Sequence, residues 1–303
     1  MADLRVKIAG VDFENPLIVA SGTFGFGHEY GTLYPLSKIG GISCKGITLL
    51  EKAGNPPPRI TETPSGMLNA VGLQNPGVEH FIEKDIPWLK EQKTKIIANV
   101  AGSCYEDYEQ MCQKLDGTDI DMIELNISCP NVKSGGVQFG TSVEGVKEIT
   151  KIVRRATSKP LMIKLTPNVT DIAEIALAAE SEGADCVSLI NTLTGMRINI
   201  NNGRPIIRNN TGGLSGPAVL PVAIRMVWQV ASKVKIPVIG LGGISTWQDA
   251  VEMMMAGADA FQIGTVLFTD PYAPIKILDG LNEFMDKKGI KNLSELTGSI
   301  KPW

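Results

Sequence analysis

The sequence predicts an α/β fold, namely a (β/α)8 TIM barrel that forms a single domain over residues 1–303. Short apolar segments alternate with stretches of helical periodicity, which is typical of β-α units in a parallel sheet. Residues 182–190 and 256–264 resemble each other, since each passes through Gly-Ala-Asp into an apolar segment. Eight strands can be placed, and an eight-stranded barrel typically spans ~250 residues plus insertions. An open doubly wound sheet is the structural alternative.

The remaining elements follow from the spacing of these strands. Residues 4–14 are expected to form a hairpin across the barrel floor, with Ala9 and Gly10 near its turn. Two capping boxes, Thr141 with Glu144 and Ser245 with Gln248, predict helix starts. The eight strands are expected near residues 16–20, 41–45, 95–100, 121–127, 160–165, 184–191, 236–241 and 259–264, with long loops at the carboxyl-terminal face at 51–76, 129–140 and 192–216.

The composition is that of a globular enzyme with a substantial core, at 43% hydrophobic and 20% charged residues. The net charge of −3 gives no support to nucleic acid or an anionic membrane as a partner. No apolar run approaches the ~18 residues of a membrane span, and the first residues lack the apolar core of a signal peptide. Five cysteines without a C-x-x-C pair argue against a disulfide framework, a zinc site or an iron–sulphur site in this chain. We therefore expect a cytoplasmic protein without a bound metal.

The residues at the strand ends are unusually polar for places where buried strands leave a core. Lys45 and Lys164 end two of the expected strands, and Asn99, Asn126 and Asn191 end three others. Any one of them could be a solvated loop residue, but buried lysines without partners are costly. Because barrel chemistry takes place at the carboxyl ends of the strands, the group as a whole favours a functional site there.

Glycines follow the last two strands. Gly242 and Gly243 come after the seventh strand, and Gly264 and Thr265 come after the eighth. Loops at these positions of a barrel often bind phosphate through backbone amides, which glycine allows to approach closely. The two pairs together indicate a phosphorylated cofactor. Residues 25–30 nearly match a dinucleotide fingerprint, but they lack its third glycine and are rejected as one.

The lysines and asparagines leave the chemistry open. Lys164, like Lys45, could form a Schiff base or could neutralise negative charge on a reduced flavin. Asparagine amides offer donors and acceptors that suit a flat ring with alternating N–H and C=O groups, such as a pyrimidine. Asparagines also populate turns, and for Asn75, which precedes Pro76, that explanation is preferred. The amides considered for the ring are those of Asn69, Asn126, Asn131 and Asn191.

Cys129 lies between Asn126 and Asn131, directly after an expected strand. It could be a nucleophile, a general base, a metal ligand or a structural thiol. The chain has only two histidines, and neither is near Cys129 in sequence, so a Cys-His hydrolase is unsupported. A base would need the thiolate form, which a nearby lysine charge would favour. Cys44 and Cys186 lie in apolar segments and are expected to be core residues.

These residues closely resemble the catalytic subunits of the class 1 dihydroorotate dehydrogenase family over essentially the full length. The segments 21–27 and 132–141 resemble the 1B subclass in particular. The most specific matches are Asn-Ile-Ser-Cys-Pro-Asn at 126–131, Met-Leu-Asn-Ala-Val-Gly-Leu-Gln-Asn at 67–75, Cys-Lys-Gly at 44–46, Asn-Thr at 191–192 and Gly-Leu-Gly-Gly-Ile at 240–244.

The resemblance implies an FMN enzyme of de novo pyrimidine (UMP) biosynthesis that oxidises (S)-dihydroorotate to orotate. Class 1 uses cysteine as the active-site base, which would be Cys129, whereas membrane-linked class 2 uses serine. In the 1B subclass a partner subunit carries FAD and an iron–sulphur cluster and passes electrons to NAD. A heterotetramer of two chains of each kind is the expected assembly.

The resemblance also implies which residues bind each ligand, and under it Lys164 contacts the flavin rather than forming a Schiff base. The implied substrate-binding residues are Lys45, Asn69, Ala70, Val71, Gly72, Leu73, Asn126, Asn131, Asn191 and Thr192. The implied FMN-binding residues are Ser21, Lys45, Gly46, Asn99, Asn126, Lys164, Ile190, Gly216, Gly242, Gly243, Gly264 and Thr265.

Four other functions compete with this one. A 1A enzyme would pass electrons from the same FMN site to fumarate without a partner subunit, and another flavin barrel could act on a different pyrimidine ring. A barrel aldolase or phosphosugar isomerase would bind no flavin, and borohydride would trap substrate on Lys164 or Lys45. A non-catalytic flavin-binding scaffold would leave Cys129 without a role.

The assignment of Cys129 as the base predicts the behaviour of one variant. Cys129→Ala should retain FMN, but dihydroorotate should reduce that flavin ~10²–10⁴-fold more slowly, because general-base catalysis typically contributes this much. Anaerobic stopped-flow absorbance measures the rate. An unchanged rate would remove Cys129 from the mechanism.

Overall fold

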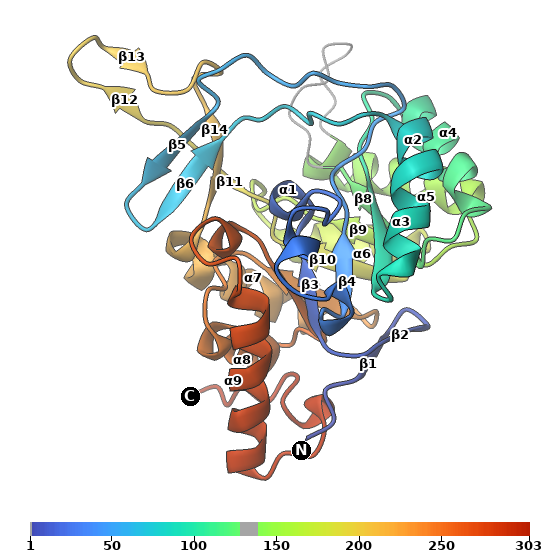
Figure 1. The fold of residues 1–303 in the computed structure, drawn as a ribbon, viewed down its shortest axis with the longest axis vertical. Helices are drawn as coiled ribbons and strands as arrows, with labels where there is room; N and C mark the ends of the chain where they lie inside the picture. The colour runs from blue at the N-terminus through green and yellow to red at the C-terminus, as the bar shows by residue number, and fades with distance from the viewer. Residues whose placement is uncertain (1, 128–138) are drawn as a thin grey trace.

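Eight parallel strands form a closed barrel in the computed structural model, which describes residues 2–127 and 139–303. Their order around the barrel is β10-β15-β16-β3-β4-β7-β8-β9, and helices cover the outside (Figure 1). The predicted TIM barrel is confirmed, and each predicted strand lies within two residues of an observed one. The barrel strands are β3 (Leu17–Val19), β4 (Gly41–Ser43), β7 (Lys95–Val100), β8 (Met122–Asn126), β9 (Leu161–Lys164), β10 (Cys186–Leu189), β15 (Val238–Leu241) and β16 (Ala260–Ile263).

Two helix starts differ by one residue from the prediction. Helix α5 is capped by Ser142, which accepts a hydrogen bond from the Gly145 N–H at 3.1 Å, and α8 is capped by Thr246 with Asp249. Both capping residues have the extended backbone that an N-cap requires. Adjacent Ser and Thr residues are equivalent candidates by residue type, so only the backbone conformation shows which of them caps the helix. The helices are α1 (Ser21–Phe24), α2 (Val78–His80), α3 (Ile86–Glu91), α4 (Tyr105–Asp116), α5 (Val143–Ala156), α6 (Ile172–Ser181), α7 (Leu220–Ala231), α8 (Trp247–Met255) and α9 (Ala273–Lys288).

The predicted hairpin closes the amino-terminal end of the barrel. Strands β1 (Val6–Ile8) and β2 (Val11–Phe13) pair in antiparallel fashion, and the turn between them has positive φ at Ala9 and Gly10. Ile8 and Phe13 are buried in one cluster with inward side chains of the barrel strands, including Met122 and Met162. The hairpin therefore serves as the floor of the barrel and leaves the opposite end for the site.

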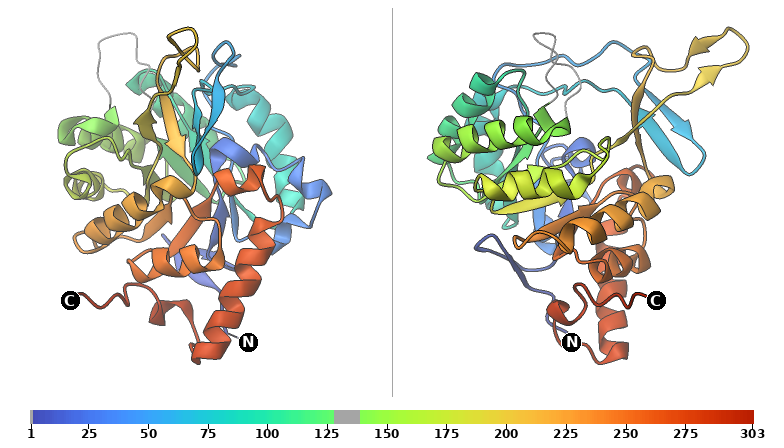
Figure 2. Two further views of the ribbon diagram at one scale, coloured as in Figure 1. Left: turned by 90° about the vertical axis from the view of Figure 1, so that its left-hand side faces the viewer. Right: turned by 180° about the vertical axis from the view of Figure 1, so that it is seen from behind.

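Two of the predicted loops at that opposite end contain strands, which the prediction missed. Strands β5 (Ile60–Thr63) and β6 (Gly66–Asn69) come from one loop, and β11 (Leu193–Gly195) and β14 (Gly212–Ser215) come from another. They form a single antiparallel sheet of order β11-β14-β6-β5. A hairpin of β12 (Ile198–Asn199) and β13 (Arg204–Pro205) projects beyond this sheet (Figures 1 and 2). Each insertion pairs with a segment more than a hundred residues away, and no local pattern reveals such a partner.

No helix within the described ranges is long and apolar enough to cross a membrane.

The floor hairpin gives a stability prediction. Phe13→Ala should lower the free energy of unfolding by about 3–5 kcal/mol, because it leaves a cavity where a fully buried ring packed. Lys7→Ala on the same hairpin removes an exposed side chain and should change stability by less than about 0.5 kcal/mol. Urea unfolding of both variants measures the difference, and equal effects would contradict the assignment of Phe13 to the core.

Candidate functional site

Polar side chains from neighbouring strands meet at the carboxyl-terminal mouth of the barrel. Asn99 lies on β7, Asn126 ends β8, Lys164 ends β9 and Asn191 follows β10. The register of the barrel brings them together, because Asn126 pairs with Lys164 across β8 and β9. The structure therefore gathers these expected residues at one end of the sheet.

A buried carboxylate that the sequence analysis did not select, that of Glu124, lies at the centre of this group. Glu124 Oε2 accepts hydrogen bonds from Ser43 Oγ at 2.5 Å and from Asn99 Nδ2 at 2.6 Å. Glu124 Oε1 accepts from Ser188 Oγ and Gln262 Nε2, each at 2.8 Å. The side chain of Glu124 is completely inaccessible to solvent.

Lys164 compensates the charge of this carboxylate. Its Nζ lies 3.8 Å from Glu124 Oε2, and both side chains are buried. Burial alone would raise the pKa of the Glu124 carboxyl group, but the Lys164 charge and the hydrogen bonds hold this pKa below its usual value. Glu124 is therefore ionised at neutral pH, and a buried cation and anion share the base of the mouth.

A chain of amides leads from the carboxylate towards the rim. Asn126 Nδ2 donates to Asn99 Oδ1 at 3.5 Å, and Asn191 Nδ2 donates to Asn126 Oδ1 at 3.3 Å. Asn191 Oδ1 accepts from the Thr192 N–H at 2.8 Å. The hydroxyl of Tyr108 on α4 donates to the backbone oxygen of Asn126 at 2.9 Å, which holds the end of β8 in place.

Asn69 and Leu73 lie near this chain of amides, whereas residues 70–72 contact Gly54, Asn55 and Arg59. Asn69 Nδ2 donates to Gly213 O at 3.4 Å, and a Cβ placed on Gly213 would lie 2.1 Å from Thr192 Oγ1. Leu73 has a φ of 55° and comes within 3.2 Å of where a Cβ on Gly46 would lie. The sheet formed by the two insertions thus brings Asn69 to the mouth, and the segment after β6 brings Leu73 there.

Glycines that follow β14, β15 and β16 form a group at this end of the barrel, which we call the glycine cradle: Gly216, Gly242, Gly243 and Gly264, together with Thr265. Strands β15 and β16 pair in parallel, so Gly242 and Gly243 after β15 lie beside Gly264 after β16. Thr265 Oγ1 donates to Ser215 Oγ at 2.8 Å, and a Cβ on Gly216 would meet Thr265 Cγ2 at 3.5 Å. Gly243 has φ +83°, and a Cβ there would lie 2.6 Å from Leu220 N.

The cradle fits the phosphate of a cofactor on two grounds. Gly216, Gly242 and Gly243 have positive φ, a backbone conformation that favours glycine. Backbone amides in such turns make concave anion sites. Ile190 and Ala20 border the cradle, since they lie within 3.0 Å and 3.5 Å of Cβ positions on Gly242 and Gly264. Ser21 directly follows Ala20 and begins α1.

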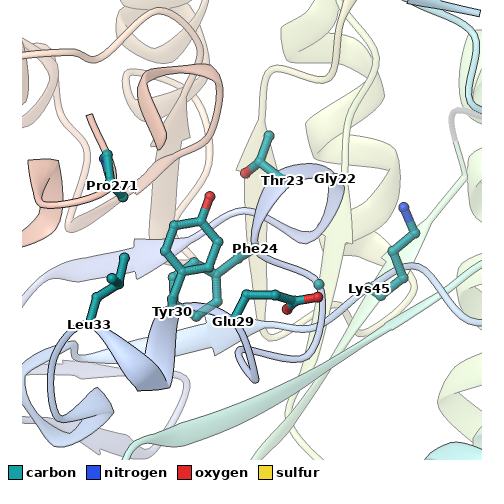
Figure 3. A pocket seen from close by; sticks show the side chains of 9 residues that line it. Gly22, Thr23, Phe24, Glu29, Tyr30, Leu33, Lys45 and Pro271 are labelled. Atoms are coloured by element: carbon teal, nitrogen blue, oxygen red, sulfur yellow. The ribbon is translucent and has the colours of Figure 1, made fainter. Parts of the chain in front are cut away.

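A cavity of about 470 Å³ opens beside the mouth (Figure 3). Lys45 lies at one edge and Pro271 at the other, and residues of α1 line the space between them. The backbone N–H of Lys45 donates to Gly25 O at 2.8 Å. Burial lowers the pKa of Lys45, and the charge of Arg59 lowers it further. Lys45 is therefore easier to deprotonate than a surface lysine.

Other cysteines and asparagines in the described part of the chain lie away from this mouth. Cys129 and Asn131 lie outside the described residues. Asn75 is buried and bonds to Thr48 and Gly77, so its role is structural, as expected. Cys44 and Cys186 are buried core residues, and burial raises the pKa of both thiols. In the ranges 2–127 and 139–303, no group of three or more His, Cys, Asp or Glu side chains is arranged to hold a metal ion.

One sequence signal for Glu124 was available. It is a charged residue inside the apolar run Met122-Ile123-Glu124-Leu125, and it has the same inward parity as Asn126. Gln262 interrupts β16 in the same way. Two polar interruptions on separate barrel strands indicate a shared polar centre, because buried polar groups need partners.

The fold and the site define a (β/α)8-barrel enzyme whose mouth carries a glycine cradle beside a buried lysine–carboxylate pair. The sequence profile described as dihydroorotate dehydrogenase matches residues 3–285. The chain is 55% identical to the dihydroorotate dehydrogenase B (NAD(+)) catalytic subunit of Bacteroides thetaiotaomicron, covering 99% of this chain and 100% of the relative. Identity to the proteins of the same name from Alkaliphilus metalliredigens and Thermoanaerobacter pseudethanolicus is 53% and 50%, with at least 98% of each chain covered. The chain therefore belongs to the dihydroorotate dehydrogenase family.

The buried ion pair predicts a pH-dependent stability difference. Lys164→Met should lower the free energy of unfolding by about 3–5 kcal/mol near pH 7, because it leaves Glu124 as an uncompensated buried charge. In the wild type the lowered pKa of Glu124 contributes stability that is present above its unfolded value of 4.5 and is lost as the pH falls through the folded value.

In Lys164→Met the pKa of Glu124 should instead rise above its unfolded value, so this variant should gain stability as the pH falls. The difference between the two proteins should shrink from pH 7 towards pH 5. Urea unfolding at a series of pH values measures it, and a constant difference would show that the ion pair is not its source.

Proposed function

We propose that this chain oxidises (S)-dihydroorotate to orotate in de novo pyrimidine biosynthesis, with FMN as its cofactor. The observation that carries the proposal is the continuous hydrogen-bonded set from Glu124 to Asn191, which lies at the barrel mouth that also carries the glycine cradle. Family membership and the names of the relatives support the same activity. When bound, the flavin supplies a hydride acceptor, and the protein supplies position and charge.

The cofactor is held at both ends. The glycine cradle binds the phosphate through backbone N–H groups, and Ser21 and Ile190 flank it. Lys164 would lie on the ring side of the cofactor, where its positive charge would favour negative charge on the ring. The complete set is Ser21, Lys45, Gly46, Asn99, Asn126, Lys164, Ile190, Gly216, Gly242, Gly243, Gly264 and Thr265.

The substrate binds above the amide chain. Amide donors and acceptors match the alternating N–H and C=O groups of the dihydropyrimidine ring, and Lys45 faces an anionic group. Cys129 removes a proton from one ring carbon, while the neighbouring carbon gives up a hydride. The complete set is Lys45, Asn69, Ala70, Val71, Gly72, Leu73, Asn126, Asn131, Asn191 and Thr192, with Cys129 as the base.

Electrons leave through a second protein subunit to NAD. The relatives are named catalytic subunits of an NAD-linked enzyme, which supports such a partner. The partner carries FAD and an iron–sulphur cluster, and two chains of each kind form a cytoplasmic heterotetramer.

The visible absorption spectrum of the purified chain tests the activity. Flavin bands should be present, acid release should yield FMN, and anaerobic dihydroorotate should bleach the bands. A colourless protein, or flavin that dihydroorotate leaves oxidised, would falsify the proposal. Turnover with fumarate alone, without the partner subunit, would favour the 1A acceptor over NAD.

A further inference from the structure

The Glu124 carboxylate accepts four side-chain hydrogen bonds, two at each oxygen. Ser43 and Asn99 donate to Oε2, and Ser188 and Gln262 donate to Oε1. An ionised carboxylate can only accept hydrogen bonds, whereas an asparagine amide has a donor end and an acceptor end. Each neighbouring amide must therefore turn its NH2 group, and not its oxygen, towards the carboxylate.

The orientation of Asn99 in turn determines the orientation of the next amide in the chain. Because Asn99 presents its NH2 group to Glu124, its Oδ1 faces Asn126 and can only accept. Asn126 then donates through Nδ2 and presents Oδ1 to Asn191, which donates in turn. Each amide has the same orientation relative to the carboxylate, and at the end of the series the Thr192 N–H donates to Asn191 Oδ1 and holds that amide in the matching orientation.

We propose that Glu124 is a positioning residue: as an obligatory acceptor it fixes, through Asn99, the direction of the Asn126 amide, whose Oδ1 then receives the Asn191 NH2 group that the Thr192 N–H orients from the other side. The inference rests on the proposed function, since it assigns Asn191 a donor edge for an acceptor oxygen of dihydroorotate or orotate. One N–H of Asn191 Nδ2 goes to Asn126, and the second N–H is the donor that this orientation supplies.

The orientation of Gln262 is independent support that the carboxylate determines how neighbouring amides are turned. Its Nε2 donates to Glu124, while its Oε1 is buried and, within the described residues, has no hydrogen-bond partner. A buried acceptor without a partner is costly. The Gln262 side chain nevertheless turns its NH2 group to Glu124. The hydrogen bond to the carboxylate therefore stabilises this orientation more than the missing hydrogen bond at Gln262 Oε1 destabilises it.

Two substitutions of Asn99 separate hydrogen-bond direction from packing. Asn99→Asp keeps the shape and still accepts from Asn126, whichever oxygen carries a proton. Asn99→Leu has a similar volume but cannot accept. If direction is what matters, Leu should weaken orotate binding to the flavin-loaded protein at least tenfold, and Asp by no more than about threefold. A packing role predicts the opposite order, since a second buried carboxylate beside Glu124 is the more disruptive change.

A double-mutant cycle tests whether the effect reaches Asn191. Orotate dissociation constants come from titrating the visible absorbance of the bound flavin in wild type, Asn99→Leu, Asn191→Ala and the double variant. Asn99→Leu should cost about tenfold when Asn191 is present and less than about threefold when it is Ala. Equal costs in the two backgrounds would overturn the proposal, because they would show that Asn99 does not act through Asn191.

The control is Ser188→Ala, which removes one donor to Glu124 that has no link to the amides. It should leave the orotate dissociation constant within about twofold of wild type. Flavin content and melting temperature are measured for each variant. If Asn99→Leu does not retain flavin, Glu124→Met replaces it in the cycle, since it removes the acceptor that orients Asn99.

Glu124→Gln tests the charge separately. Its amide oxygen can stay beside Lys164 and Asn99 while its nitrogen turns to the unpartnered Gln262 Oε1, so direction is kept and orotate affinity should fall by less than about threefold. A tenfold loss in Glu124→Gln would show that charge, not direction, is what Glu124 supplies. Wild-type flavin that neither binds orotate nor reacts with dihydroorotate would instead refute the proposed function.

Discussion

The burial of one carboxylate at the centre of the barrel is the constraint on which the site depends. Removing an ion from water costs several kcal/mol unless charge and hydrogen bonds compensate it. Glu124 obtains that compensation from side chains on five other strands: Ser43 on β4, Asn99 on β7, Lys164 on β9, Ser188 on β10 and Gln262 on β16. A closed barrel is suited to this, because inward side chains from all strands converge on one axis.

The same constraint separates the two ends of the barrel. Below Glu124 the interior is apolar, where Met122 and Met162 pack against the floor hairpin. Above it the interior is polar, because the amides of Asn99, Asn126 and Asn191 continue the hydrogen bonding out to the rim. One carboxylate therefore marks the level at which a stabilising core gives way to a surface that can recognise polar ligands.

Sequence patterns predicted the barrel strands well and its centre poorly, for physical reasons. Each strand is a short apolar run between turn residues, which is a local signal. The strand ends with Lys164 and Asn126 could be recognised for the same reason. Glu124 is one acidic residue inside such a run, and its meaning depends on partners up to 138 residues away, such as Gln262. The capping residues Ser142 and Thr246 were missed by one position because backbone conformation, not residue type, decides between neighbours.

The sheet above the mouth has a consequence for how such proteins diversify. Strand β6 carries Asn69, and its partner β14 comes from an insertion that begins after β10, so neither insertion can pair in this way alone. Leu68 lies opposite Leu214, and a change in length on one side shifts the register on the other. Grafting the loop that contains β5 and β6 from a distant homologue would thus transfer only two of the four strands of this sheet. Chimeras that exchange residues 51–76 and 192–216 together preserve this pairing, whereas exchange of one alone leaves strand edges without their matched partner.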